Sequence, residues 1–153
     1  MLPPGLFLRP VTPADDVARH ISVIYQEYDL VYDPQFEDDL LDCSASYSAG
    51  AFWVIEDERG IVATGAVVPN GGARLIKRMY VAARARRLGL ARVLLHQCLG
   101  WGDFARSELW SDVRFPAAHR LYQREGFVPG PVRVLTDPDA SVERYFRRDS
   151  MGD

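Results

Sequence analysis

The sequence has one dense group of positive charge, in the stretch RARRLGLARVLL at residues 84–95. Four arginines surround a single glycine, Gly89, and they are Arg84, Arg86, Arg87 and Arg92. Guanidinium groups bind phosphate oxygens in pairs, and a glycine lets a ligand approach the backbone closely. Because the whole chain has a net charge of −3, this group is local. Its chemistry predicts a small anionic partner, a phosphate or a pyrophosphate.

The arginine-rich stretch lies between a predicted strand and a predicted helix that starts near Gly89. A helix N-terminus exposes unpaired N–H groups and carries about half a positive charge, so it is a natural anion site. The chain has neither GxGxxG nor the glycine–lysine pattern of a P-loop, which excludes those phosphate loops. The pattern present is Arg86-x-x-Gly89-x-Ala91, and taken alone it also fits a solvated basic helix start.

Composition limits the class of protein. The 153 residues, 48% of them apolar, predict one domain over residues 1–153 with a substantial core. With 21 acidic and 18 basic residues, bulk charge does not favour nucleic-acid binding. No apolar run approaches the roughly 20 residues of a membrane span, and the N-terminal residues lack the pattern of a secretory signal. Two cysteines are too few for a disulfide framework, so we expect a cytoplasmic protein.

The hydrophobic pattern predicts alternating strands and helices. The expected strands are residues 6–11, 51–57, 61–69, 73–81 and 107–113, followed by an antiparallel pair near the C-terminus. The expected helices run from about Pro13 to Tyr28, over 34–47, over 89–103 and over 116–125. This order predicts an α/β fold, with one mixed sheet and helices on both faces.

Side-chain patterns refine three of these elements. Thr12 and Asp15 have the spacing of a capping box, which predicts the start of the first helix. In the second helix we expect three residues to face the core, and they are Phe36, Leu40 and Leu41. In the strand over 73–81, alternation places Leu75, Lys77, Met79 and Val81 on one face and Ile76, Arg78 and Tyr80 on the other.

A second motif lies one strand beyond the arginines, in LWSDVRFPAAHRLYQREGF at residues 109–127. Its pattern A-x-x-L-Y-x-x-x-G-F is formed by Ala118, Leu121, Tyr122, Gly126 and Phe127. Together with Arg86-x-x-Gly89-x-Ala91, this chain resembles the GNAT superfamily of acyl-CoA-dependent N-acetyltransferases, and the order of elements agrees over nearly its whole length. The resemblance implies a mostly antiparallel sheet that splays between strands 4 and 5.

The resemblance also implies roles for individual residues. The backbone of Met79, Tyr80 and Val81 would pair with the pantetheine arm of acetyl-CoA. Amides in the segment that begins after Arg86 would hold the pyrophosphate, and the residues concerned are Arg87, Leu88, Gly89, Leu90, Ala91 and Arg92. The 3′-phosphate would meet Arg84, Arg87 or Arg92. Tyr122 matches the tyrosine that protonates the leaving thiolate, which is chemically reasonable because a phenol with a pKa near 10 can donate to a thiolate as it forms.

The chain departs from the family pattern in two places. Phe115 stands where relatives often have asparagine, and the fourth strand offers no acidic residue as general base. Glu108, Asp112 and His119 are the other candidates near the motif. We expect the amine proton to leave through bound water near the strand end, with Asp112 as the final proton acceptor. No cluster of side chains has metal-ligand spacing, so we expect no metal.

The acceptor is predicted from residues 25–39, where aromatic and acidic side chains alternate. Acids attract a cationic amine and aromatic rings hold it, although the acids also fit a solvated helix face. The acids and aromatic rings therefore predict a small primary amine as the acceptor. Lys77, Arg78 and Arg114 favour a carboxylate on the same molecule, so an amino acid or other zwitterion is one option. Two alternatives to catalysis stay open, a non-catalytic acyl-CoA-binding or sensing module and a nucleic-acid-binding domain. A homodimer is an open option for the assembly.

Overall fold

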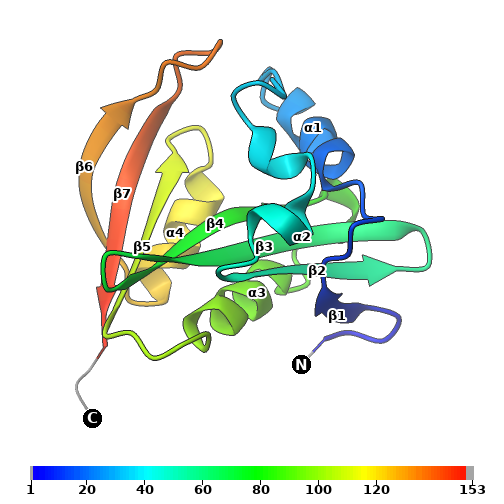
Figure 1. Ribbon diagram of the computed structural model, residues 1–153, viewed down its shortest axis with the longest axis horizontal. Helices are drawn as coiled ribbons and strands as arrows, with labels where there is room; N and C mark the ends of the chain where they lie inside the picture. The colour runs from blue at the N-terminus through cyan, green and yellow to red at the C-terminus, as the bar shows by residue number, and fades with distance from the viewer. Residues whose placement is uncertain (1, 151–153) are drawn as a thin grey trace.

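The structure is a computed structural model that describes residues 2–150. Seven strands form one sheet in the order β1-β2-β3-β4-β5-β7-β6 (Figure 1). They are β1 (Phe7–Pro10), β2 (Ala51–Asp57), β3 (Gly60–Asn70), β4 (Ala73–Val81), β5 (Arg106–Asp112), β6 (Val128–Val134) and β7 (Val142–Asp149). All neighbours pair antiparallel except β4 and β5, which are parallel. The predicted mixed sheet is confirmed.

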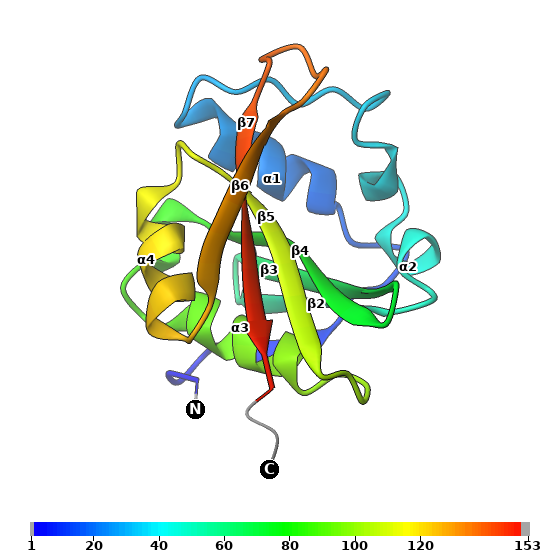
Figure 2. The ribbon, with the colours of Figure 1, turned by 90° about the vertical axis from the view of Figure 1, so that its left-hand side faces the viewer.

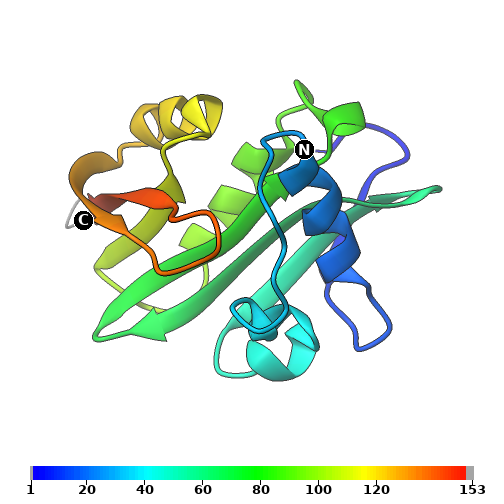
Figure 3. The same ribbon diagram turned by 90° about the horizontal axis from the view of Figure 1, so that it is seen from above.

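Helices cover both faces of the sheet, also as predicted (Figure 3). They are α1 (Val17–Gln26), α2 (Cys43–Ser46), α3 (Leu90–Leu99) and α4 (Pro116–Arg124). The side chains of β2 point to both faces of the sheet. Phe52 and Val54 belong to a buried hydrophobic cluster with residues of α1, whereas Ile55 belongs to a buried cluster with residues of α3. Within residues 2–150, no helix combines the length and apolar character needed to cross a bilayer.

Helix α1 is shorter than predicted, because Thr12 and Asp15 close a separate turn ahead of it instead of forming its first turn. The Asp15 carboxylate accepts a hydrogen bond from the backbone N–H of Thr12 at 2.7 Å and two from the Arg9 guanidinium at 2.8 Å. Asp16 is the N-cap instead and accepts from the N–H of Arg19 at 3.1 Å. A tertiary ion pair therefore moved the start of the helix to Val17. Helix α3 is also shorter than predicted and ends before Gly100.

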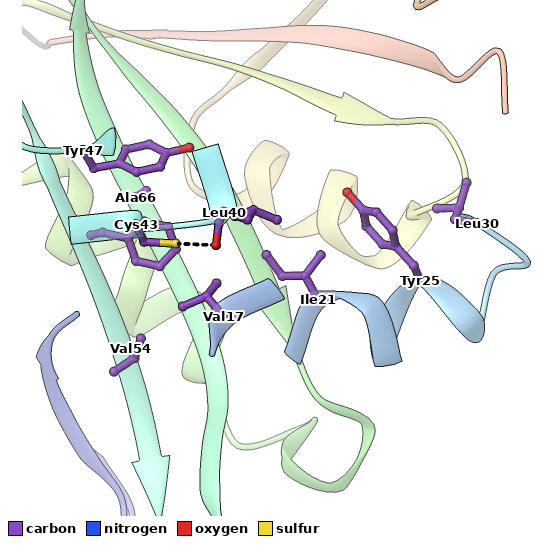
Figure 4. Close-up of a cluster of buried hydrophobic side chains, with 10 residues drawn as sticks. Val17, Ile21, Tyr25, Leu30, Leu40, Cys43, Tyr47, Val54 and Ala66 are labelled. Atoms are coloured by element: carbon purple, nitrogen blue, oxygen red, sulfur yellow. Dashed lines mark hydrogen bonds between the residues drawn. The ribbon is translucent and has the colours of Figure 1, made fainter. Parts of the chain in front are cut away.

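The predicted helix over residues 34–47 is wrong. The segment contains only a 3-10 turn, η1 (Asp38–Leu40), and the short helix α2. Leu40 is buried as expected, but the side chains of Phe36 and Leu41 are 44% and 69% exposed. Figure 4 shows Leu40 in the core beside α1, where its carbonyl oxygen accepts from the Cys43 thiol at 3.9 Å. Ion pairs to β4 impose this irregular path, as described below.

The parallel pair β4–β5 is short, and this creates the site. Its register joins residues 74–76 to residues 107–109 and ends there. Beyond Ile76 and Leu109 the strands diverge, and β5 continues along β7 over its whole length (Figure 2). The splay between strands 4 and 5 is confirmed. Within residues 2–150, β4 has no strand partner on this side beyond Ile76, so those of its backbone N–H and C=O groups that point away from β3 face the opening.

Candidate functional site

A cleft of about 1420 Å³ occupies the opening between β4 and β5. Its walls come from β4, β5, the loop before α3, the start of α4, the segment over residues 24–39 and the β6–β7 hairpin. The last two walls touch each other, because Asp139 accepts a hydrogen bond from the N–H of Val31 at 2.9 Å. The cleft therefore lies where β4 and β5 diverge, and this contact joins two of its walls.

The predicted phosphate loop lies at one end of this cleft. Gly89 is the N-cap of α3 with φ +76°, and Arg87 also has a left-handed φ of +66°. A Cβ atom added to Gly89 would meet nothing within 4 Å, so the helix N-terminus opens freely onto the cleft. Among residues 2–150, no side chain caps α3, and its first N–H groups are available to an anion.

The arginines around this loop differ in their partners. Arg86 pairs with Glu27 at 2.6 Å and 2.9 Å and donates to the carbonyl oxygen of Val81, so it anchors the loop to α1 and β4. Arg84 pairs with Asp57, and Arg92 with Glu125. Arg87 lines the cleft and, within the described residues, makes no ion pair. Of the three arginines predicted for the 3′-phosphate, Arg87 has the most available charge.

A β-bulge in β4 reorients the centre of the cleft. The register passes from Thr64 opposite Tyr80 to Ala66 opposite Lys77, and Arg78 has φ +59°. One extra residue shifts the alternation, so the predicted faces of this strand are wrong. Ile76, Met79 and Val81 pack toward α3, whereas Lys77, Arg78 and Tyr80 point toward α1 and α2.

Tyr122 lies in the cleft, with its ring packed against Phe127 and Phe146 at centroid distances of 6.0 Å and 5.6 Å. Burial raises the pKa of its phenol, and nearby Tyr80 adds to the effect. The phenol therefore keeps its proton at neutral pH. Its hydroxyl has no hydrogen-bond partner within residues 2–150. The structure thus brings Tyr122 into one cleft with the phosphate loop and with Met79, Tyr80 and Val81.

The candidate bases have other environments. Asp112 lines the cleft, but its carboxylate accepts three hydrogen bonds from Arg114, at 2.8 Å, 2.9 Å and 3.0 Å. Glu108 accepts from the Tyr145 hydroxyl and lies at a small hollow beside the β3–β4 turn, away from the cleft. His119 packs on Phe146, and burial lowers its pKa. Only Asp112 shares the cleft with Tyr122.

The sequence reasoning missed a buried cluster around Arg78. Its guanidinium donates to Asp39 at 2.9 Å and 2.6 Å and to Glu37 at 2.9 Å. Burial alone would raise the pKa of Asp39, but hydrogen bonds from Arg78 and Tyr47 outweigh it, so this pKa lies below its usual range. Glu37 and Asp39 are thus not a solvated helix face. No local pattern reveals this cluster, because its members are about 40 positions apart in the chain.

Comparison with known proteins agrees with this geometry. Residues 48–129 match the family model described as "Acetyltransferase (GNAT) domain". The chain is similar to an acetyltransferase of the GNAT family from Staphylococcus aureus Mu50, with a TM-score of 0.78 and 19% identity over 94% of this chain and 98% of that one. An acetyltransferase from Streptococcus agalactiae 2603 gives 0.79 and 17% over 95% and 99%.

A plant structure shows the same fold. Arabidopsis thaliana NAA60, solved with a bisubstrate analogue, gives a TM-score of 0.71 and 14% identity over 97% of this chain and 99% of that one. No curated protein matches the sequence. At these identities the structural neighbours show the fold.

Proposed function

Because this chain belongs to the GNAT family of acetyltransferases and is an acyltransferase, we propose that it transfers an acetyl group from acetyl-CoA to the primary amine of a small molecule. The observation that supports this proposal is the splayed cleft. An open helix N-terminus lies at one end, unpaired β4 backbone runs along its wall, and a protonated phenol lies inside.

The residues fit acetyl-CoA in three places. The N–H groups from Arg87 to Arg92 hold the pyrophosphate, while Arg86 fixes the loop through Glu27. Arg87 meets the 3′-phosphate. The backbone of Met79–Val81, free of a partner strand on the cleft side, pairs with the amides of the pantetheine arm.

Acetyl-CoA, when bound, supplies a thioester whose carbonyl carbon a neutral amine attacks directly. A backbone N–H of β4 beyond the bulge, that of Tyr80 or Val81, stabilises the negative charge on the carbonyl oxygen. Tyr122 holds a proton for the leaving sulfur, and its raised pKa keeps that proton in place until the thiolate forms. The sequence-predicted proton acceptor, Asp112, stays a prediction, and Arg114 already occupies both of its oxygens.

The acceptor pocket lies on the α1 side of the cleft. Arg78 and Arg114 are neutralised by acids of the protein itself, which leaves Lys77 without an ion pair among residues 2–150. Asp33 and Asp38 line the same cleft as Lys77. An amino acid or other zwitterion would place its carboxylate at Lys77 and its amine toward the acids. A simple amine would use the acids alone.

A panel of primary amines tests the proposal, with release of free thiol from acetyl-CoA as the signal. We expect turnover with some amines and, among them, a preference between amino acids and amines that lack a carboxylate. This preference reports whether Lys77 binds the carboxylate of the acceptor. Tight acetyl-CoA binding without thiol release for any amine would contradict catalysis and favour a non-catalytic acyl-CoA-binding module.

A further inference from the structure

Three side chains that line the cleft form a hydrogen-bonded chain, and the proposed function does not use their side-chain groups. The Tyr80 hydroxyl, on β4 just beyond the bulge, lies 3.1 Å from the Tyr25 hydroxyl on α1. Tyr25 in turn donates to Oε1 of Glu37. All three residues line the cleft. The chain therefore connects Tyr80, on the acceptor side of the cleft, to the buried carboxylate of Glu37.

The direction of these hydrogen bonds follows from counting protons. A phenol has one O–H to donate. Tyr25 donates its proton to Glu37, so in its contact with Tyr80 it must accept. Tyr80 is then the donor to Tyr25, and the remaining lone pair of its oxygen is left to accept. The arrangement is oriented to pass a proton from Tyr80 toward Glu37.

The charge at the far end suits a proton acceptor. One guanidinium, that of Arg78, pairs with two carboxylates, those of Glu37 and Asp39. The cluster consequently has a net charge of −1 and becomes neutral when it takes up one proton. Asp39 has a two-point contact with Arg78 of its own, so protonation of Glu37 leaves Arg78 held in place.

Tyr80 and Tyr122 approach the reacting centre from opposite faces of the sheet. Tyr122 belongs to the buried hydrophobic cluster that includes residues of α3 and α4, whereas Tyr80 packs against the cluster that includes residues of α1. Figure 4 shows Tyr25 in the α1 cluster. The splay between β4 and β5 is where the two cores meet. Both Tyr80 and Tyr122 line the same cleft. Tyr122 serves the leaving sulfur, so an opposing group is needed for the amine.

Resting on the proposed function, we propose that Tyr80 takes the proton of the attacking amine and that Tyr25 relays it to Glu37. The amine nitrogen forms the C–N bond as the C–S bond breaks. The N–H proton passes to the Tyr80 oxygen, the Tyr80 proton to Tyr25, and the Tyr25 proton to the Glu37 carboxylate. The sulfur takes the Tyr122 proton. Glu37 later loses a proton to water and Tyr122 regains one, so the products are an amide and a free thiol.

Tyr80 is thus a catalytic residue, while Tyr25 and Glu37 act through it. Burial raises the pKa of both phenols, which keeps them protonated and suits a relay rather than a phenolate base. The titratable and charged groups that face Glu37 are Tyr25 on α1, Tyr32, Asp39 on η1, and Arg78 and Tyr80 on β4. Asp112, held by Arg114, is not part of this path.

Three variants interrupt the chain without changing side-chain shape: Tyr80→Phe, Tyr25→Phe and Glu37→Gln. We expect Tyr80→Phe to lower kcat at pH 7 by about 100-fold, a typical cost of losing acid–base catalysis. Tyr25→Phe and Glu37→Gln are expected to lower kcat about tenfold or more and to leave the KM for acetyl-CoA unchanged. The double variant should lose little more kcat than either single variant, because interrupting the same proton path at a second residue adds little further loss.

The pH profile separates a relay from a structural role. The loss in Tyr25→Phe should narrow as the pH rises, because solvent then removes the amine proton more readily. Tyr47→Phe is the matched control, since Tyr47 also donates a phenol proton to a carboxylate partner of Arg78, that of Asp39. Asp39 lines the cleft, whereas Tyr47 is not among the described residues that line it. The Tyr47→Phe variant should keep wild-type kcat.

Three results would overturn the relay: wild-type kcat in Tyr25→Phe, losses equal at every pH, or equal losses in Tyr47→Phe. Failure of the wild-type protein to acetylate any amine would instead reject the proposed function, so the two failures are distinguishable. Circular dichroism and thermal melts of each variant verify that the kinetic losses come from folded protein.

Discussion

Replacing Gly89 with glutamine tests the phosphate loop most directly. Gly89 has φ +76°, which costs a residue with a Cβ atom about 1 kcal/mol. A Cβ atom there meets nothing within 4 Å, so no steric clash adds to this cost. For a chain of this length, the melting temperature should fall by only about 2–4 °C.

The effect on binding should be much larger. The glutamine side chain would occupy the space in front of the first N–H groups of α3, where the pyrophosphate is proposed to bind. Each hydrogen bond to a charged group is worth about 1.5–3 kcal/mol, so loss of two of them weakens acetyl-CoA binding by roughly 100-fold to 10,000-fold. The perturbation thus separates a small loss of stability from a large loss of affinity.

Calorimetric titration with acetyl-CoA and a thermal melt measure the two effects side by side. Gly5→Gln is the matched control, because Gly5 has φ +82°, has nothing within 4 Å of an added Cβ and lies outside the cleft. It should show a similar loss of stability and bind like the wild type. Wild-type affinity in Gly89→Gln, or equal affinity losses in both variants, would refute the assignment of the phosphate loop.

Three further predictions concern single side chains. Tyr122→Phe should lower kcat about 100-fold to 10,000-fold without lowering the melting temperature, since the hydroxyl has no partner within residues 2–150; unchanged kcat at saturating substrates would reduce Tyr122 to a packing role. Asp112→Asn should lower kcat no more than about tenfold, well below the usual cost of losing a general base, because Arg114 already holds this carboxylate and the proposed proton path runs through Tyr80 and Tyr25 instead; complete loss of turnover would make Asp112 the base. Hydrogen bonds from Arg9 hold the pKa of Asp15 at about 2, below its unfolded value of about 3.9, so Asp15→Asn should cost about 1 kcal/mol at pH 7 after solvent screening. That difference should disappear as the pH falls from about 4 toward 2, and a pH-independent difference in urea unfolding would contradict it.

Local chemistry determined much of this protein from the sequence alone. Turn residues and hydrophobic periods predicted the strands, because a strand or helix shows its exposed and buried faces in its own spacing. The loop before α3 and Tyr122 were predicted because each motif lies within a short stretch of chain. Two such motifs in the right order sufficed to indicate the family.

Tertiary contacts decided the rest. The bulge in β4 turned Lys77 and Met79 to opposite faces, and a single inserted residue of this kind leaves no trace in an alternating pattern. Arg78 pairs with Glu37 and Asp39, and the predicted helix over 34–47 is reduced to a 3-10 turn and the short helix α2. Arg9 pairs with Asp15 in the turn that precedes the first helix. Such ion pairs join residues that are far apart in the chain, so their energy depends on where the folded sheet places them. For that reason the anion loop could be predicted from the sequence, while the acceptor side and its proton path emerged only from the structure.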